Sequence, residues 1–126
     1  MTMIDINNID GVEIALVEAD KPVIKDYESA EALIDTILDN SKAEGIVIGE
    51  PGVSEEFFNP DGKFAGNIRD EFRKRGLKLC IYGDMNRFFG KPFHEFLYEV
   101  NMEGTLYYAE TQAEAIDHIL GKETGN

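Results

Sequence analysis

A short, continuously apolar run at residues 45–49, Gly-Ile-Val-Ile-Gly, constrains the fold more than any other part of the sequence. Its length and its β-branched residues are typical of a strand that helices cover on both faces. Strands of this kind occur mainly in parallel sheets. A second run, Leu-Lys-Leu-Cys-Ile-Tyr-Gly at residues 77–83, gives another strand. The two runs therefore predict an α/β domain built around a parallel sheet.

Helical patterns alternate with these strands. Apolar residues recur at three- and four-residue spacing in 28–41, in 61–74, in a segment that Pro92 opens, and in 111–120. Residues 105–109 give a further strand. Near the start of the chain, the segments 4–6 and 12–17 flank an Asp-Gly turn and predict a β-hairpin.

The predicted fold is an N-terminal β-hairpin followed by three βα units. Right-handed crossovers turn this order into a mixed, mostly parallel sheet with flanking helices. We expect Ser29, or Tyr27 and Glu28, to mark the start of the first helix, and Asn59 or Asp61 to cap the second. The last helix has the spacing of a capping box, Thr-Gln-Ala-Glu at residues 111–114.

Length and composition indicate one water-soluble domain. The chain has 126 residues, of which 43% are hydrophobic, and we expect a single domain over residues 1–121 with a polar tail at 122–126. No apolar stretch approaches the roughly 20 residues that cross a bilayer. The first residues lack the basic region and apolar run of a secretory signal, so we expect the protein in the cytoplasm.

Charge and cysteine content exclude several classes of function. Cys80 is the only cysteine, which excludes an internal disulfide framework and a multi-thiolate zinc site. The net charge of -13 repels phosphate backbones and anionic lipid, so no nucleic-acid or membrane partner is expected.

The charge is also uneven along the chain. Residues 63–91 hold eight of the 12 basic residues and carry a net +5, whereas the remainder carries -18. This segment can attract an acidic partner or another copy of the chain, or it can be an ordinary solvated helix.

Several motifs resemble the bacterial family catalogued as domain of unknown function 4180, over nearly the whole chain. They are Ala-Leu-Val-Glu-Ala-Asp at 15–20, Glu-Phe-Phe at 56–58, Gly-Lys-Phe-Ala-Gly at 62–66, Leu-Lys-Leu-Cys-Ile-Tyr-Gly-Asp at 77–84, and Phe-His-Glu-Phe-Leu-Tyr-Glu-Val-Asn at 93–101. The resemblance implies no catalytic residues, because the family is named for its lack of an assigned function.

The order of elements is also similar to the STAS (anti-sigma-factor-antagonist) fold. That likeness implies a regulatory serine before the helix that follows the third strand. Here the helix is preceded by Asn-Pro-Asp-Gly at 59–62, without a serine. Ser54 lies upstream and replaces it only if the element boundaries differ from those predicted.

Acidic residues follow the strands of the predicted parallel sheet, and Glu18, Glu50 and Asp84 are the main ones. Because the carboxyl ends of parallel strands share one rim, these carboxylates are expected to converge there. They can hold Mg²⁺ or Ca²⁺, or act as acid and base groups. The alternative is that they cap the helices that follow. No phosphate-loop or dinucleotide motif is present.

Aromatic residues can add apolar walls to this rim. Phe57 and Phe58 follow one strand, and Arg87, Phe88 and Phe89 lie in the loop after the next. If both pairs reach the rim they form an apolar cleft with polar edges; alternatively, one ring of each pair enters the core. The candidate ligand or partner rim therefore consists of Glu18, Glu50, Phe58, Asp84, Arg87 and Phe88.

From these patterns we expect a noncatalytic regulatory or protein-interaction module that binds a protein partner or forms a homodimer. The alternative is a small-molecule or divalent-metal-binding enzyme that uses the carboxylates at the rim. No cofactor, catalytic residue or defined metal-ligand set is predicted. His94 and His118 have no partner at metal-ligand spacing and are expected on the surface or on helix flanks.

Overall fold

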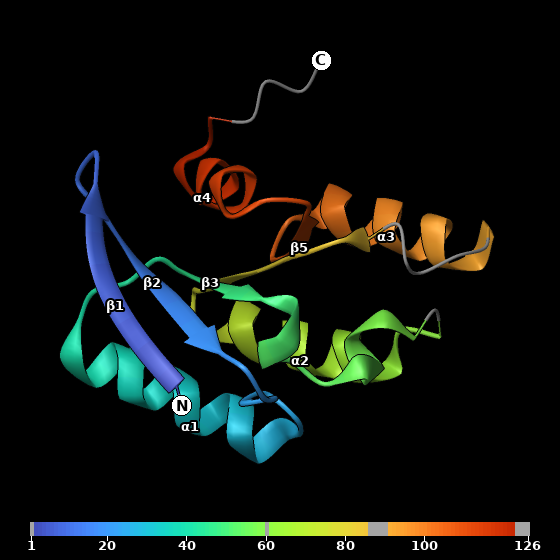
Figure 1. Cartoon of the computed structure of the whole chain (residues 1–126), viewed down its shortest axis with the longest axis horizontal. Helices are drawn as coiled ribbons and strands as arrows, with labels where there is room; N and C mark the ends of the chain where they lie inside the picture. The colour runs from blue at the N-terminus through green and yellow to red at the C-terminus, as the bar shows by residue number, and fades with distance from the viewer. Residues whose placement is uncertain (1, 60, 86–90, 123–126) are drawn as a thin grey trace.

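The computed structural model describes residues 2–59, 61–85 and 91–122, without the side chains of residues 91–93. Five strands form one sheet in the order β1-β2-β3-β4-β5 (Figure 1). The strands are β1 Thr2–Ile9, β2 Val12–Ala19, β3 Gly45–Gly49, β4 Lys78–Tyr82 and β5 Leu106–Ala109. β1 runs antiparallel to β2, and the other neighbours are parallel. The predicted α/β fold with a mixed, mostly parallel sheet is confirmed.

Four α-helices cover the sheet in two layers. They are α1 Tyr27–Asn40, α2 Lys63–Lys74, α3 Lys91–Glu103 and α4 Gln112–Leu120. α4 lies on the opposite side of the sheet from α1 and α2 (Figure 1). The side chains of β3 alternate between the two layers: Ile46 and Ile48 join the core with α1, α2 and α3, and Val47 joins the core with α4. Burial on both faces explains why the central strand is apolar throughout.

The β1–β2 hairpin turns within two residues. Asp10 and Gly11 have φ angles of 54° and 86°, the pair of positive values that defines a type I′ turn. The carboxamide of Asn8 accepts a bond from the Gly11 N–H at 3.0 Å. The full pairing runs from Ile9 opposite Val12 to Thr2 opposite Ala19, so β1 is longer than the predicted segment 4–6.

α1 begins at Tyr27, as one of the two predicted starts has it, whereas the residue at the N-cap of α2 is neither of the predicted ones. α1 is capped by Asp26, whose carboxylate accepts from the Ser29 N–H at 2.7 Å, while the Ser29 hydroxyl accepts from the Asp26 N–H. α2 has Gly62 at its N-cap position, without a side-chain cap. Asp61 nevertheless accepts from the Lys63 N–H at 2.9 Å.

Two 3-10 helices, η1 Glu50–Gly52 and η2 Glu55–Phe58, connect β3 to α2 and were not predicted. Half of the predicted capping box of α4 is confirmed, because the Thr111 hydroxyl accepts from the Glu114 N–H at 3.1 Å, whereas the Glu114 carboxylate accepts from the Glu110 N–H at 3.3 Å. At the end of the chain, Lys122 pairs with Asp10 in the hairpin turn. The rest of the predicted tail, residues 123–126, lies outside the described residues.

Candidate functional site

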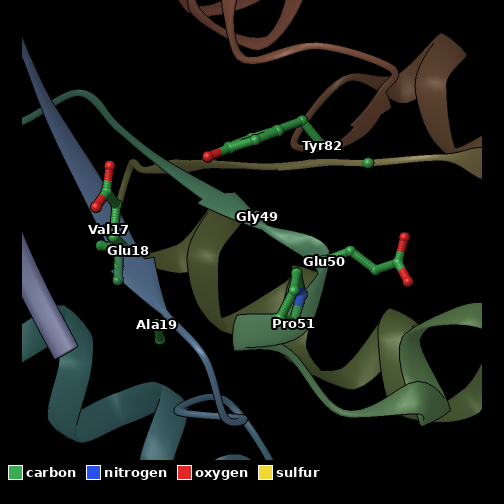
Figure 2. Close-up of a pocket in the computed structure, with 8 residues that line it drawn as sticks. Val17, Glu18, Ala19, Gly49, Glu50, Pro51 and Tyr82 are labelled. Atoms are coloured by element: carbon green, nitrogen blue, oxygen red, sulfur yellow. The ribbon is translucent and has the colours of Figure 1, made fainter. Parts of the chain in front are cut away.

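A cleft lies at the carboxyl ends of β2, β3 and β4, the place where the sequence predicts a rim. Its volume is about 330 Å³, and Figure 2 shows the residues around it. β2 contributes Val17, Glu18 and Ala19; the end of β3 and the start of η1 contribute Gly49, Glu50 and Pro51; the end of β4 contributes Tyr82 and Gly83. Parallel strands bring these segments together although they are distant in sequence.

Two of the predicted carboxylates, Glu18 and Glu50, line this cleft. The Tyr82 hydroxyl points toward the side where Glu18 lies, whereas the Glu50 carboxylate extends the other way (Figure 2). Burial, and after it the charge of Glu18, raises the pKa of the Tyr82 phenol. A Cβ on Gly83 would lie 2.7 Å from Glu50 Oε2, so the side chain of Glu50 packs directly over this glycine.

The other predicted site residues have different positions. Asp84 is exposed and follows Gly83, so it lies at the same end of the sheet but outside the lining of the cleft. Phe58 is buried in the core, where its ring packs against Tyr108 with centroids 5.6 Å apart. Its place on the rim was therefore predicted wrongly, because the turn of η2 directs the ring inward. Arg87 and Phe88 lie outside the described residues.

Two observations bear on whether the strand-end acids cap helices or bind a metal ion. The side-chain caps of α1, η2 and α4 are Asp26, Ser54 and Thr111, none of which belongs to Glu18, Glu50 and Asp84. Within residues 2–59, 61–85 and 91–122, no group of three or more His, Cys, Asp or Glu side chains is placed to hold a metal ion.

Arginines of the basic segment pair with acidic residues of the same chain. Arg73 lies 3.3 Å from Glu103 of α3, and Arg75 lies 2.5 Å from Asp35 of α1. The buried Glu71 accepts a bond from the Tyr27 hydroxyl at 2.7 Å. These contacts link α2 to α1 and α3, so part of the positive charge of this segment is already compensated within the chain.

The sheet has two edges, and α3 closes the one at β5. Thr105 and Ala109 accept backbone bonds from the β4 side, so alternation directs the N–H and C=O of Tyr108 to the outer side. The Asn101 carboxamide from α3 meets both groups: Nδ2 donates to the Tyr108 carbonyl at 3.0 Å, and Oδ1 accepts from its N–H at 2.9 Å. A side chain therefore takes the place of a further strand.

The edge at β1 is open along eight residues. β1 contains no Lys, Arg or Pro, and every one of its side chains is exposed or half-buried. Ile4 and Ile6 are 36% and 39% exposed, and they lie opposite Val17 and Ala15, which belong to the core on the α1 side. Among the described residues no strand pairs with the outer side of β1. A long edge with one charged residue, no proline and no cover is ready to accept another strand.

α3 presents a second exposed apolar surface. A groove of about 410 Å³ is lined by His94, Leu97, Tyr98, Asn101 and Met102. Tyr98 and Met102 are 68% and 71% exposed, and both residue types are enriched in protein interfaces.

Neither the β1 edge nor Asn101 was singled out from the sequence. The available signal for β1 was its alternating pattern of residues without a basic residue or proline. The Asn101 contact gives no local signal, because it joins a helix to a strand through side-chain geometry.

Comparison with models of known protein families identifies the family of the chain. The model of a family described as a domain of unknown function (DUF4180) matches residues 9–119. The chain belongs to the DUF4180 family. The matched span of this DUF4180 member begins at the last residue of β1 and ends within α4, so it contains the whole cleft.

No curated protein and no solved structure matches the chain.

The likeness to the STAS fold therefore stays a prediction. Ser54, the serine considered for that likeness, lies at the start of η2 of this DUF4180 domain, where its hydroxyl accepts from the Glu56 N–H at 3.2 Å. None of the helices in the described part of the chain is both long and apolar enough to span a bilayer.

Proposed function

We propose that this DUF4180 domain is a noncatalytic, regulatory protein-interaction module of the cytoplasm that binds a strand of its partner along β1. The open edge of β1 carries this proposal. β5, the other edge, is only four residues long and is closed by Asn101. The contrast supports a role for β1, because an exposed edge favours unwanted association unless a partner uses it.

Strand addition matches the chemistry that β1 offers. Backbone N–H and C=O groups on the outer edge supply affinity for any extended segment, and side chains on alternating positions supply selectivity. Ile4 and Ile6 face the same side as the core residues Val17 and Ala15. A partner strand with apolar residues at matching positions would extend that core.

A photoreactive residue at position 6 tests the proposal in living cells that produce the full chain. Asn67 is the matched control position, because it is exposed on α2, away from the β1 edge. We expect a defined adduct with a partner chain from position 6 and none from position 67. The purified partner should then bind the wild-type chain and not the Ile6→Lys variant. Equal labelling at the two positions, or none at position 6, would contradict the proposal.

The cleft supports a second candidate function, which is binding of a small ligand, with Glu18 as the residue that contacts it. Its place at the strand ends and its mixed lining are typical of ligand sites in α/β folds. Thermal unfolding with Mg²⁺, Ca²⁺ and a panel of small organic amines tests it. A saturating ligand at about 100 times its Kd adds roughly 2.7 kcal/mol. We expect a shift that Glu18→Gln removes; no shift with any of these ligands counts against the site.

A further inference from the structure

We propose that the strand added to β1 is β1 of a second copy, paired antiparallel about a two-fold axis at Ile6. This inference rests on the proposed function and names its partner. It predicts a continuous ten-stranded sheet in which the two hairpins lie side by side.

The turn of the hairpin fixes which backbone groups face outward. In a two-residue type I′ hairpin the residues that flank the turn, Ile9 and Val12, form a hydrogen-bonded pair. Bonded pairs alternate along the ladder, so the odd-numbered residues of β1 bond to β2. The N–H and C=O groups of Ile4, Ile6 and Asn8 are therefore directed to the open edge.

A two-fold axis perpendicular to the sheet restricts the register. Such an axis places the same face of both copies on one side of the joined sheet. Odd-numbered residues of one copy therefore stand opposite odd-numbered residues of the other, and even-numbered residues opposite even-numbered ones. Four registers then pair at least five residues of each strand, and they are centred on Ile4, Asp5, Ile6 or Asn7. The register at Asp5 sets two carboxylates directly opposite each other, which is unfavourable. The registers at Ile4 and Asn7 pair only five residues of each strand, 2–6 and 5–9.

The register at Ile6 is complementary on the face that carries the odd-numbered residues. Asp5 lies opposite Asn7 of the second copy, where the carboxamide can donate to the carboxylate. On the same face, Met3 lies opposite Ile9 of the second copy. On the other face, the two Ile6 side chains meet at the axis. Residues 4, 6 and 8 of both copies then exchange about six backbone hydrogen bonds.

Charge makes this dimer weak and dependent on salt. Each copy carries a net charge of -13, so the two copies repel one another at long range. β1 itself contains only one charged residue, Asp5. Screening lowers the long-range repulsion and leaves the short-range backbone bonds in place, so association should strengthen as salt is added.

Sedimentation equilibrium of the full chain over a range of concentrations tests the association. Ile6→Lys sets two ammonium groups opposite each other at the axis, and we expect it to weaken the dimer at least tenfold. Asn67→Lys adds the same charge on α2 and should leave the dimer unchanged. A wild-type chain that stays monomeric at high concentration and high salt overturns the inference, as does equal weakening by both variants.

Single cysteines introduced at positions 4, 5 and 6 report the register, while the native Cys80 is buried in the sheet. Opposite residues of a bonded pair have Cα atoms about 5.5 Å apart, inside the range of a disulfide. Diagonal neighbours are about 7–8 Å apart. We expect a disulfide-linked dimer from Ile6→Cys only, and cross-linking at position 4 or 5 in its place overturns the inference. If the chain is monomeric while position 6 captures another protein in cells, this inference falls and the proposed function stands.

Discussion

Replacing Asn101 with alanine removes the side chain that closes the β5 edge. The wild-type carboxamide bonds to both backbone groups of Tyr108, at 3.0 and 2.9 Å, and Tyr108 is only 3% exposed. A buried backbone group that loses its partner costs about 1–3 kcal/mol. Because Asn101 itself is half-buried, water reaches part of the vacated space, and we expect a loss of about 2–4 kcal/mol in the free energy of unfolding.

Urea unfolding followed by far-ultraviolet circular dichroism measures this loss. Asn67→Ala is the matched control, because it makes the same exchange on the exposed side of α2 and should stay within about 0.5 kcal/mol of wild type. Asn101→Asp keeps an acceptor for the Tyr108 N–H but sets a carboxylate oxygen against the Tyr108 carbonyl, so at neutral pH it should lose at least as much stability as Asn101→Ala. The reasoning is refuted if Asn101→Ala unfolds like Asn67→Ala.

Three further predictions concern the core, the cap of α1 and the cleft. In Gly45→Ala, the added Cβ would lie 2.5 Å from Ile119 Cδ1, so urea unfolding should show a loss of about 1–3 kcal/mol. Shortening Ile119 to valine should partly restore the stability, and no loss in Gly45→Ala would show that the Ile119 side chain or α4 moves aside without cost. Bonds to Ser29 lower the pKa of Asp26, so its stabilising effect is present above the ordinary carboxyl pKa and lost as pH falls through the lowered folded value. The unfolding midpoints of wild type and Asp26→Ala should therefore differ at neutral pH and converge in acid, and a constant difference would contradict this. Glu18→Gln should lower the pKa of Tyr82 in an ultraviolet absorbance titration, because burial then acts without the added charge; an unchanged pKa would place Glu18 away from the phenol.

The sequence predicted the order of elements because each central strand has a pattern of its own. Residues 45–49 are apolar on both faces, since α4 covers one face and the other helices cover the second. The edge strand β1 was predicted too short, because Asn7 and Asn8 are of a residue type typical of turns. The cap of α1, Asp26, was missed because Ser29 completes its capping box in place of the usual Glu or Gln.

The candidate site was predictable only where the topology determines it. Glu18 and Glu50 line one cleft because parallel neighbours end at the same edge. Phe58 is buried because of the direction of a short 3-10 helix, which the sequence does not indicate. His118 was expected at the surface or on a helix flank; it is buried, bonds to the Gly104 carbonyl at 2.7 Å and stacks on Tyr107. These positions depend on contacts between distant segments, which no local spacing encodes.

Hydrogen exchange of individual β1 amides, followed by NMR at several protein concentrations, tests most directly whether the open edge accepts a strand. The amides of Asp5 and Asn7 bond to β2 and should stay protected at every concentration. The amides of Ile4 and Ile6 should be protected at high concentration and lose that protection on dilution. Rapid exchange of Ile4 and Ile6 at all concentrations, and also after addition of any partner captured through position 6, would contradict the account.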